Sequence, residues 1–190
     1  PDASPTDQVR QSFQSSLEHL QTDYIDSYVL HGPSTQGALT DMDWEVWGAM
    51  EEIHTSGKTK FLGISNVNLP QLEALVEKAA VAPTFVQNRC YARNRWDGAV
   101  REFCQAHDIL YQGFSLLTAN VHELSVPPVA QLVQKLGRSI PEIVFRFAQQ
   151  VGMIPLTGTT NADHMAQDLT CYEFELSSEE VNQIENIAVQ

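Results

Sequence analysis

The sequence predicts an α/β chain in which short parallel strands alternate with helices, and three observations support this fold class. Five short apolar segments begin near residues 24, 60, 84, 109 and 153, and residues with helical apolar spacing follow each one. These segments are apolar on both faces, which is typical of parallel strands buried beneath helices. No Gly-x-Gly-x-x-Gly follows any of them, so the dinucleotide-binding fingerprint is absent. The alternation therefore leaves two architectures open, a doubly wound sheet or a barrel.

The first expected element is a helix. Ser4, Pro5 and Asp7 form a helix-start signal, and apolar residues follow at helical spacing from Val9 to Leu20. A repeating strand–helix protein normally begins with a strand. We therefore expect that further sequence precedes this helix in the intact protein.

The remaining elements follow in alternation. We expect strands at residues 24–31, 60–65, 83–88, 109–115 and 153–157. We expect a helix capped by Asp41 or Asp43 and closed by Gly57, and a helix from Leu69 to Ala79 capped by Asn68. The later helices are expected from Asp97 through Cys104, from Pro127 to Leu136, from Pro141 to a stop at Gly152, from Ala162 to Leu169 and from Ser177 to about Ala188. No low-complexity linker divides the chain, so we expect a single domain over residues 1–190.

Length, composition and charge exclude several classes of function. The chain has 190 residues, which is short for a complete eight-unit α/β barrel of about 250 residues. Its net charge of −13 would repel a phosphate backbone, so we expect no nucleic-acid partner. No apolar run approaches the roughly 18 residues that span a bilayer, so we expect no membrane partner.

Cysteine usage favours a reducing compartment. Cys90, Cys104 and Cys171 are odd in number, and no Cys or His pair has zinc-ligand spacing. We therefore expect buried free thiols, a cytoplasmic location and no metal site.

Polar residues recur where the predicted strands end. The strand ends are His31, Ser65-Asn66, Gln87-Asn88, Phe114-Ser115 and Thr157-Gly158-Thr159-Thr160. Asparagine and glutamine amides suit a primary carboxamide, an aromatic ring stacks on a heterocycle, and free N–H groups at a helix start suit phosphate. Each residue also has a structural explanation, such as helix capping for Ser65-Asn66. The coincidence at five strand ends favours a binding site at the carboxyl edge.

The chain resembles the carboxy-terminal two-thirds of an aldo-keto reductase. The matching segments are Ser16–Leu20 with Tyr24–Pro33, Gly57–Asn66, Val86-Gln87, Gly113–Ser115, Ile154–Thr160 and Phe174–Glu180. Their order and spacing agree over nearly all of the sequence. The resemblance implies a (β/α)8 barrel of the TIM type, truncated here to about the last five strand–helix units.

The resemblance also implies roles for individual residues. His31 corresponds to the active-site histidine that orients or polarises the substrate carbonyl, and this is the catalytic residue that we expect. The implied cofactor-binding residues are Ser65, Asn66 and Gln87 at the nicotinamide carboxamide, Phe114 stacked on the nicotinamide ring, Ser115 and Leu116 along the pyrophosphate, and Thr157, Gly158, Thr159, Thr160, His164, Gln167 and Asp168 around the adenosine phosphate.

Two departures from the family pattern affect the expected function. No residue of this chain matches the family's proton-donor tyrosine or its lysine and aspartate helpers, so we expect these residues alone to be inactive. Leu156 and His164 stand where many members carry lysine and arginine, so NADPH is expected as cofactor with NADH as an alternative.

The expected activity is NAD(P)H-dependent reduction of a small aldehyde or ketone. The alternative is a non-catalytic truncated barrel that binds nucleotide or self-associates through its open edges. We expect the loops at 32–41 and 116–127 to shape the substrate pocket, with Tyr91 and Trp96 as apolar walls. Trp44 is either a further wall or, as its spacing from Trp47 favours, a packing residue of its helix.

Overall fold

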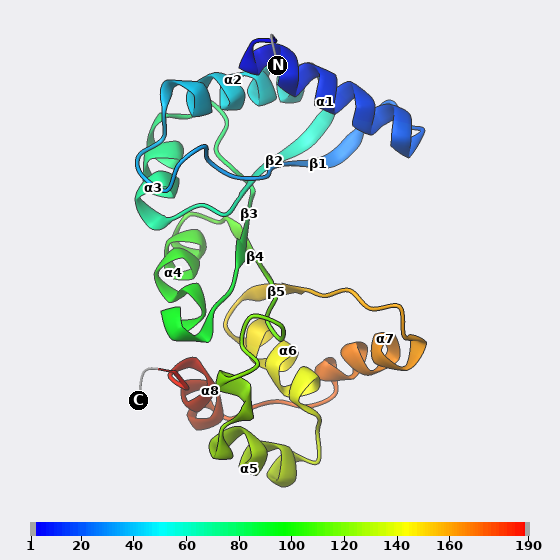
Figure 1. Ribbon diagram of the computed structural model, residues 1–190, viewed down its shortest axis with the longest axis vertical. Helices are drawn as coiled ribbons and strands as arrows, with labels where there is room; N and C mark the ends of the chain where they lie inside the picture. The colour runs from blue at the N-terminus through cyan, green and yellow to red at the C-terminus, as the bar shows by residue number, and fades with distance from the viewer. Residues whose placement is uncertain (1–2, 189–190) are drawn as a thin grey trace. The chain divides into compact units, whose positions relative to one another are not determined.

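The computed structural model describes residues 3–188, and its internal contacts divide the chain into two compact units (Figure 1). The first unit is Pro1–Gln87 and the second is Asn88–Gln190. Each unit combines parallel strands with covering helices. The expectation of a single domain over residues 1–190 stays a prediction.

The first unit contains three helices and most of three strands. In chain order they are α1 (Pro5–Leu20), β1 (Ile25–Leu30), α2 (Asp41–Thr55), β2 (Thr59–Ser65), α3 (Leu69–Lys78) and β3 (Phe85–Arg89), whose last two residues belong to the second unit. β1 pairs in parallel with β2, and β2 pairs in parallel with β3. Leu30 lies opposite Ile64 and Ser65 lies opposite Gln87, so the strands end at nearly the same level.

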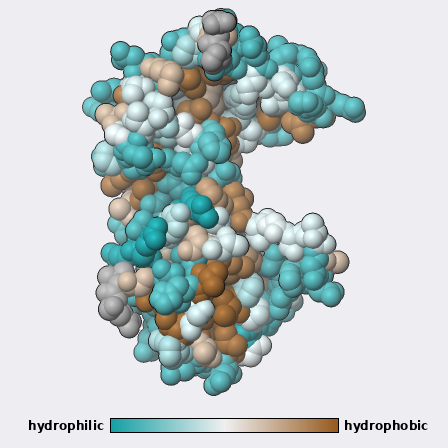
Figure 2. Space-filling model, in the orientation of Figure 1, coloured by the Kyte–Doolittle hydropathy of each residue, from teal (hydrophilic) through white to brown (hydrophobic). Residues whose placement is uncertain are grey.

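Helices α1 and α2 lie side by side against β1 and β2 (Figure 1). Buried side chains from both helices and from β2 form the core, and the largest of them are Phe13, Trp47, Met50, Leu62 and Ile64. The visible outer side of α1 carries mainly hydrophilic residues (Figure 2). The apolar stripe from Val9 to Leu17 thus faces inward, as its spacing predicts.

The second unit contains the remaining elements. They are a 3₁₀ segment (Ala92–Asp97), α4 (Gly98–Ala106), β4 (Leu110–Phe114), a 3₁₀ turn (Glu123–Ser125), α5 (Pro127–Leu136), α6 (Ile140–Gln150), β5 (Met153–Leu156), α7 (Ala162–Leu169), a 3₁₀ turn (Thr170–Tyr172) and α8 (Ser178–Glu185). β4 pairs in parallel with β5, and Phe114 lies opposite Leu156. The predicted alternation of strand and helix is therefore confirmed.

Helix starts follow the predicted caps with one exception. Ser4, Asn68 and Ser177 each accept a main-chain N–H in the first turn of the helix that follows. The expectation that Asp41 or Asp43 caps the second helix is wrong, because Thr40 is the N-cap. The Asp43 carboxylate bonds back to the Thr40 main-chain N–H instead, which completes a capping box.

Element ends differ from the predictions by a few residues. β3 begins at Phe85 rather than Pro83, since proline has no main-chain N–H for the strand ladder, and it continues to Arg89. The last helix ends at Glu185, earlier than the predicted Ala188. The predicted strand-end residues from His31 to Thr157 still lie within or directly after a strand, while Gly158, Thr159 and Thr160 lie in the turn between β5 and α7.

Candidate functional site

The first unit brings four of the predicted residues to one end of its strands. His31 directly follows β1, Ser65 and Asn66 stand at the end of β2, and Gln87 lies in β3 opposite Ser65. Asn66 has a left-handed backbone with φ of 53°, a conformation that asparagine tolerates better than most residues. This conformation ends β2 and turns the chain toward α3.

A short chain of hydrogen bonds joins these strand ends. The Ser65 hydroxyl donates to the Gln87 carbonyl oxygen at 2.6 Å, and the Asn66 main-chain N–H donates to the same oxygen at 3.1 Å. The Asn66 side-chain Nδ2 donates to the His31 carbonyl oxygen at 2.8 Å and to Ser65 Oγ at 3.1 Å. The Asn66 Oδ1 receives no hydrogen bond from any described residue. This partly exposed acceptor is therefore not used within the described part of the chain.

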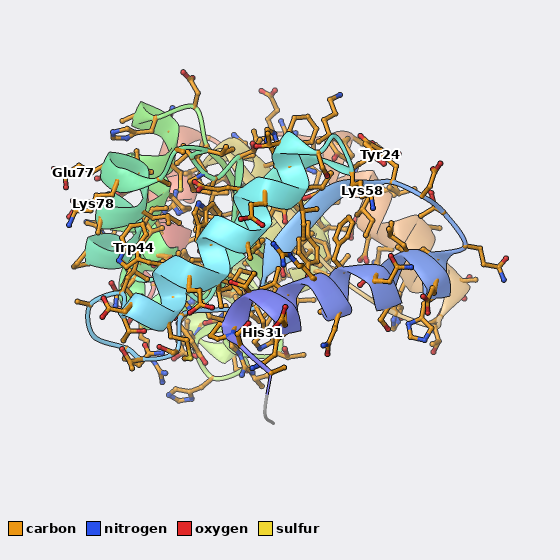
Figure 3. The ribbon with its side chains drawn as sticks, turned by 90° about the horizontal axis from the view of Figure 1, so that it is seen from above. Tyr24, His31, Trp44, Lys58, Glu77 and Lys78 are labelled. Carbon is orange, nitrogen blue, oxygen red and sulfur yellow. The ribbon has the colours of Figure 1, made fainter. Side chains whose placement is uncertain are left out.

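His31 is exposed at the rim of a cavity of about 480 Å³. In Figure 3, His31 lies at the end of the unit opposite to Tyr24 and Lys58. The cavity is lined by α1, β1 and α2, with Val9, Leu30, Met42 and Val46 among its apolar side chains. An imidazole in this position has its own ring free for a ligand, since no described residue hydrogen-bonds to it.

Buried side chains fix the loop that follows His31. The Asp43 carboxylate accepts the Ser34 main-chain N–H at 2.7 Å and the Thr40 main-chain N–H at 2.8 Å. Burial raises the pKa of Asp43, but these N–H bonds and the hydroxyls of Thr40 and Ser34 outweigh that effect and lower it. The Gln71 amide donates to two further loop carbonyls, at 2.9 and 2.6 Å. The loop at 32–41 is therefore held to α2 and α3 by these buried side chains.

The second unit gathers a different group of predicted residues. Ser115, Leu116, Thr157 and Gly158 line a cavity of about 260 Å³ whose floor includes Phe145 of α6. Ser115 has a left-handed backbone with φ of 57° directly after β4, as Asn66 has after β2. Phe114 is half-buried at the end of β4. Leu116 is almost fully buried, so its contribution to this cavity is packing and main-chain atoms.

Helix α7 corrects one expectation about phosphate binding. The Asn161 side chain accepts the main-chain N–H of Asp163 at 2.8 Å and that of His164 at 3.3 Å. Two of the first-turn N–H groups that we expected to be free for phosphate, those of Asp163 and His164, are therefore capped from within the chain. His164 is exposed, and Thr159 and Thr160 lie in the turn before the helix.

The other two predicted residues of α7 have partners inside the second unit. Gln167 Nε2 donates to Glu142 at 3.3 Å, and Asp168 accepts from the Thr157 hydroxyl at 3.5 Å. Their side chains thus hold α7 against the loop after β5 and against α6. Sequence reasoning did not predict these internal roles.

Glu142 is the residue that the sequence analysis missed. Its carboxylate accepts from Ser139 N at 2.8 Å, Thr170 Oγ1 at 2.7 Å, Arg138 at 3.0 Å and Gln167. Burial raises its pKa, but these hydrogen bonds outweigh burial and lower it to about 2. The signal was the Ser-x-x-Glu capping box at the start of α6, which predicts the Ser139 contact but not the others.

One predicted pocket wall is wrong. Trp96 is fully buried, packs 5.3 Å from the Phe147 ring and donates its indole N–H to the Ile184 carbonyl oxygen at 2.9 Å. It is a core residue because both its ring and its polar atom find partners inside the unit. Tyr91 and Trp44 are half-buried.

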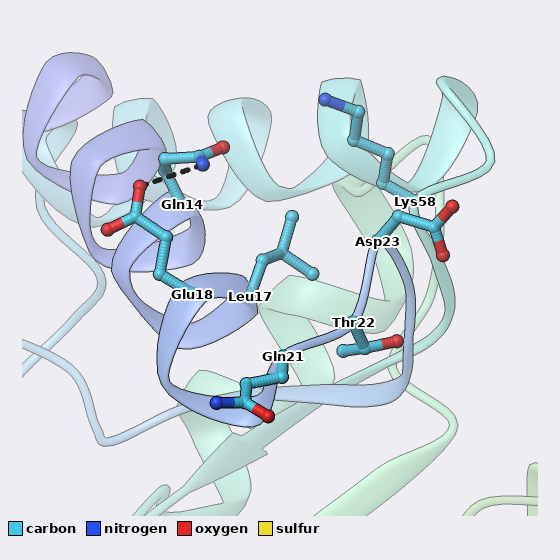
Figure 4. A pocket seen from close by; sticks show the side chains of 7 residues that line it. All are labelled: Gln14, Leu17, Glu18, Gln21, Thr22, Asp23 and Lys58. Atoms are coloured by element: carbon cyan, nitrogen blue, oxygen red, sulfur yellow. Dashed lines mark hydrogen bonds between the residues drawn. The ribbon is translucent and has the colours of Figure 1, made fainter.

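A further hollow lies at the other end of the first unit. Its lining includes the polar residues Gln14, Glu18, Asp23 and Lys58 and the apolar Leu17, with a hydrogen bond of 3.0 Å from Gln14 to Glu18 (Figure 4). None of the predicted site residues lies there. The amino ends of the strands therefore carry no part of the predicted site.

The cysteines behave as predicted. Cys90, Cys104 and Cys171 are free and buried, and burial together with the Asp97 charge raises the pKa of Cys90 and Cys104 to about 12. Across residues 3–188 no cluster of three His, Cys, Asp or Glu side chains is arranged to hold a metal ion. Within the same range every helix is too short or too polar to cross a membrane.

Comparison with known families decides the classification. The family model described as "Aldo/keto reductase family" matches residues 2–189. The chain belongs to the aldo/keto reductase family. The resemblance inferred from the strand-end residues is thereby confirmed.

Curated reductases are similar over nearly all of the chain. The NADPH-dependent alpha-keto amide reductase of Saccharomyces cerevisiae is 27% identical over 200 residues, an alignment that covers 100% of this chain and 64% of that protein. The glyoxal reductase of Bacillus subtilis is 26% identical over 174 residues, which cover 92% of this chain and 60% of that protein. The chain therefore spans about three-fifths of the length of these relatives.

Solved aldo/keto reductase structures match the fold. An aldo/keto reductase from Brucella melitensis superposes with a TM-score of 0.84 at 25% identity, covering 96% of this chain and 67% of that one. An aldo-keto reductase complexed with NADPH superposes with a TM-score of 0.83 at 22% identity, covering 96% and 60% of the two chains. The predicted fold class, about five strand–helix units of an aldo/keto reductase barrel, is confirmed.

Proposed function

We propose that this chain carries the cofactor-binding part of an NAD(P)H-dependent aldo/keto reductase that reduces small aldehydes or ketones. The observation that carries the proposal is the hydrogen-bonded junction of His31, Ser65, Asn66 and Gln87 at the ends of three parallel strands. The Asn66 Oδ1 has no donor among the described residues, so it can accept a hydrogen bond from a ligand. A primary carboxamide supplies such a donor.

In the first unit, Ser65, Asn66 and Gln87 would hold the nicotinamide carboxamide. When bound, the reduced nicotinamide supplies a hydride to a carbonyl carbon. His31 would donate a ring N–H to the substrate carbonyl oxygen and so orient and polarise it. The cavity beside His31 has apolar walls that would exclude water from the substrate.

In the second unit, Phe114 would stack on the nicotinamide ring, and Ser115 and Leu116 would follow the pyrophosphate. The cavity that holds Ser115, Thr157 and Gly158 offers hydroxyl and main-chain groups of the kind that phosphate accepts. Thr159, Thr160, His164, Gln167 and Asp168 belong to the segment that would surround the adenosine phosphate.

The choice between NADPH and NADH rests on charge. No lysine or arginine lines the cavity beside Leu156, and the α7 N–H groups of Asp163 and His164 are capped by Asn161. A 2′-phosphate would therefore find hydroxyl partners but no cation there. We propose NADPH as the cofactor, with a small preference over NADH, in a cytoplasmic enzyme.

We also propose that residues 1–190 alone bind the cofactor without reducing a carbonyl. Hydride addition creates an alkoxide that needs a proton, and no residue of this chain matches the family's tyrosine, lysine and aspartate. We therefore expect residues 1–190 to bind NADPH without oxidising it in the presence of a carbonyl compound, and one set of measurements tests both expectations.

The experiment measures NADPH binding by calorimetry and NADPH oxidation with a reactive aldehyde. We expect saturable binding and oxidation no faster than the buffer background. Asn66→Gly should weaken NADPH binding about tenfold, since one or two amide hydrogen bonds are lost. Asn182→Ala on α8 should bind as the parent chain does. Absence of NADPH binding, or turnover well above background, would contradict the proposal.

A self-assembling module is the second candidate, and β1 supplies the observation that favours it. Among the described residues β1 pairs with β2 alone, and an apolar cavity of about 480 Å³ lies beside it. An unpaired strand edge next to apolar side chains is a template for another strand. Size-exclusion chromatography with light scattering tests this: a monomer at all concentrations contradicts assembly, and a dimer that dissociates in Val29→Pro supports it.

A further inference from the structure

Asn120 is almost fully buried although its side chain is polar, with 1% of the residue exposed. Its side-chain nitrogen donates to the carbonyl oxygen of Leu116 at 2.8 Å and to that of Cys90 at 2.9 Å. Its side-chain oxygen accepts the Ala92 main-chain N–H at 2.7 Å. Both polar atoms of the amide are therefore paired, and a buried amide paired in this way holds the main chain around it in one arrangement.

These three hydrogen bonds join two segments of the second unit that are far apart in the sequence. Cys90 and Ala92 precede Asn120 by 30 and 28 residues, whereas Leu116 lies in the turn directly after β4. The Cys90 main-chain N–H also donates to the carbonyl oxygen of Phe114, the last residue of β4, at 3.1 Å. The segment 90–92 therefore holds the end of β4 directly and the turn that follows through Asn120.

We refer to residues 115–119 as the cavity turn. Three successive carbonyl oxygens, those of residues 115–117, accept hydrogen bonds from the Ala119 main-chain N–H, the Asn120 side chain and the Asn120 main-chain N–H. By contrast, the main-chain N–H groups of residues 116–118 donate to no described residue. The cavity turn thus has three successive donors that remain unused, while the carbonyl oxygens beside them are engaged.

The residues that carry these donors line the cavity of about 260 Å³ in the second unit. Leu116, Leu117 and Thr118 are all among its lining residues, together with the hydroxyl residues Ser115 and Thr157. No acidic residue lines this cavity, although the net charge of the chain is −13. Consecutive main-chain N–H groups without a carboxylate beside them suit the oxygen atoms of an anion. Under the proposed function that anion is the pyrophosphate of the cofactor.

We propose that Asn120 is a positioning residue that holds the cavity turn in the shape that binds the pyrophosphate. Because its amide fixes the turn before a ligand arrives, the three N–H donors need no rearrangement on binding. Only a side-chain amide supplies both the N–H donors and the acceptor that this position uses, and an ionised aspartate of the same shape would face the Leu116 and Cys90 carbonyl oxygens with an oxygen atom. The inference rests on the proposed function, since the pyrophosphate belongs to NADPH.

The experiment measures hydrogen exchange at the main-chain amides of residues 116–118 together with NADPH affinity by calorimetry. We expect saturating NADPH to slow exchange at these amides about tenfold in the parent chain. Asn120→Asp should bind NADPH about tenfold more weakly and lose most of that protection even at saturation, since the turn loses its hydrogen bond to the amide. The matched control Leu132→Ala removes a buried side chain of α5 in the same unit and should keep the parent affinity and protection.

Two outcomes overturn the proposal. NADPH that binds the parent chain without slowing exchange at residues 116–118 lies elsewhere, and this result needs no variant to fold. Equal losses of affinity in Asn120→Asp and Leu132→Ala mean that only the stability of the second unit matters. Inorganic pyrophosphate is titrated in parallel to keep the two proposals apart. If NADPH does not bind, the proposed function fails; pyrophosphate that protects the same amides in the parent chain but not in Asn120→Asp still supports the role of Asn120, and protection by neither ligand overturns it.

Discussion

Asn66 donates its side-chain N–H to the carbonyl oxygen of His31 at 2.8 Å, and so ties the end of β2 to the residue that follows β1. The same amide reaches Ser65 Oγ at 3.1 Å, whose hydroxyl donates to Gln87. One asparagine therefore sets the spacing of three strand ends. Because the Asn66 backbone is left-handed, the stability of the protein should depend on which residue occupies this position.

Two substitutions of Asn66 distinguish the stability contributed by its side-chain hydrogen bonds from the cost of its left-handed backbone. Asn66→Gly should lower the free energy of unfolding by about 1–2 kcal/mol, because hydrogen bonds to His31 and Ser65 are lost. Asn66→Ala should cost about 1 kcal/mol more, because alanine disfavours a φ of 53°. Urea denaturation of the two variants measures the difference. Equal stability of the two would show that the backbone here is not strained.

Glu142 should make the chain sensitive to acid. Its folded pKa of about 2 lies below the ordinary value of 4.5, so its stabilisation is complete above pH 4.5 and disappears as the pH falls toward 2. Glu142→Gln should lose about 1–3 kcal/mol of stability at pH 7 and show a flatter decline between pH 4.5 and 2. Denaturation at several pH values measures this. Glu102→Gln, an exposed position on α4, is the control and should keep the parent profile.

Two glycines should respond to alanine with opposite signs. A Cβ on Gly63 in β2 would lie 3.0 Å from both the Phe85 carbonyl oxygen and Val29 Cγ2, so Gly63→Ala should destabilise by about 1–3 kcal/mol. A Cβ on Gly48 in α2 would meet nothing within 4 Å, so Gly48→Ala should stabilise by about 0.5–1 kcal/mol. Thermal melting of both variants checks this. A stabilising effect of Gly63→Ala would contradict this prediction, because it would mean that β1 and β3 can move away from β2 without loss of stability.

A lysine at position 156 should strengthen the preference for NADPH. Leu156 lines the cavity of the second unit, where no described lysine or arginine is present. Leu156→Lys should raise the ratio of NADPH to NADH affinity about tenfold, since a 2′-phosphate gains a charge-assisted partner. Competitive calorimetry measures the ratio. Leu110→Lys, at a residue of β4 that is 48% exposed, should leave the ratio unchanged.

Most of the fold was predictable because its signals are local. Apolar periodicity, capping residues or turn signals marked each helix from α1 to α8, and double-sided apolar runs marked the strands. The ends were less predictable. Thr40 caps α2 although two aspartates follow it, since a capping box requires both a cap and a partner three residues later, and the pattern allows more than one reading.

The candidate site was predictable only in part, because long-range contacts decide which polar atoms remain available. The sequence placed Asn161 before α7 but did not show that its side chain would cap the N–H groups expected to hold phosphate. It likewise suggested Trp96 as a pocket wall, while the partner of its indole, Ile184, is 88 residues away.

The three buried cysteines allow the opening of the folded chain to be followed by thiol labelling. Cys90, Cys104 and Cys171 are each no more than 2% exposed, and the raised pKa values keep their thiols protonated. A thiol-reactive dye should therefore label the folded chain at the rate at which it opens, without any engineered site. A single cysteine added at an exposed position would in turn be the sole fast-reacting group, so a fluorophore can be attached there without first removing the native thiols.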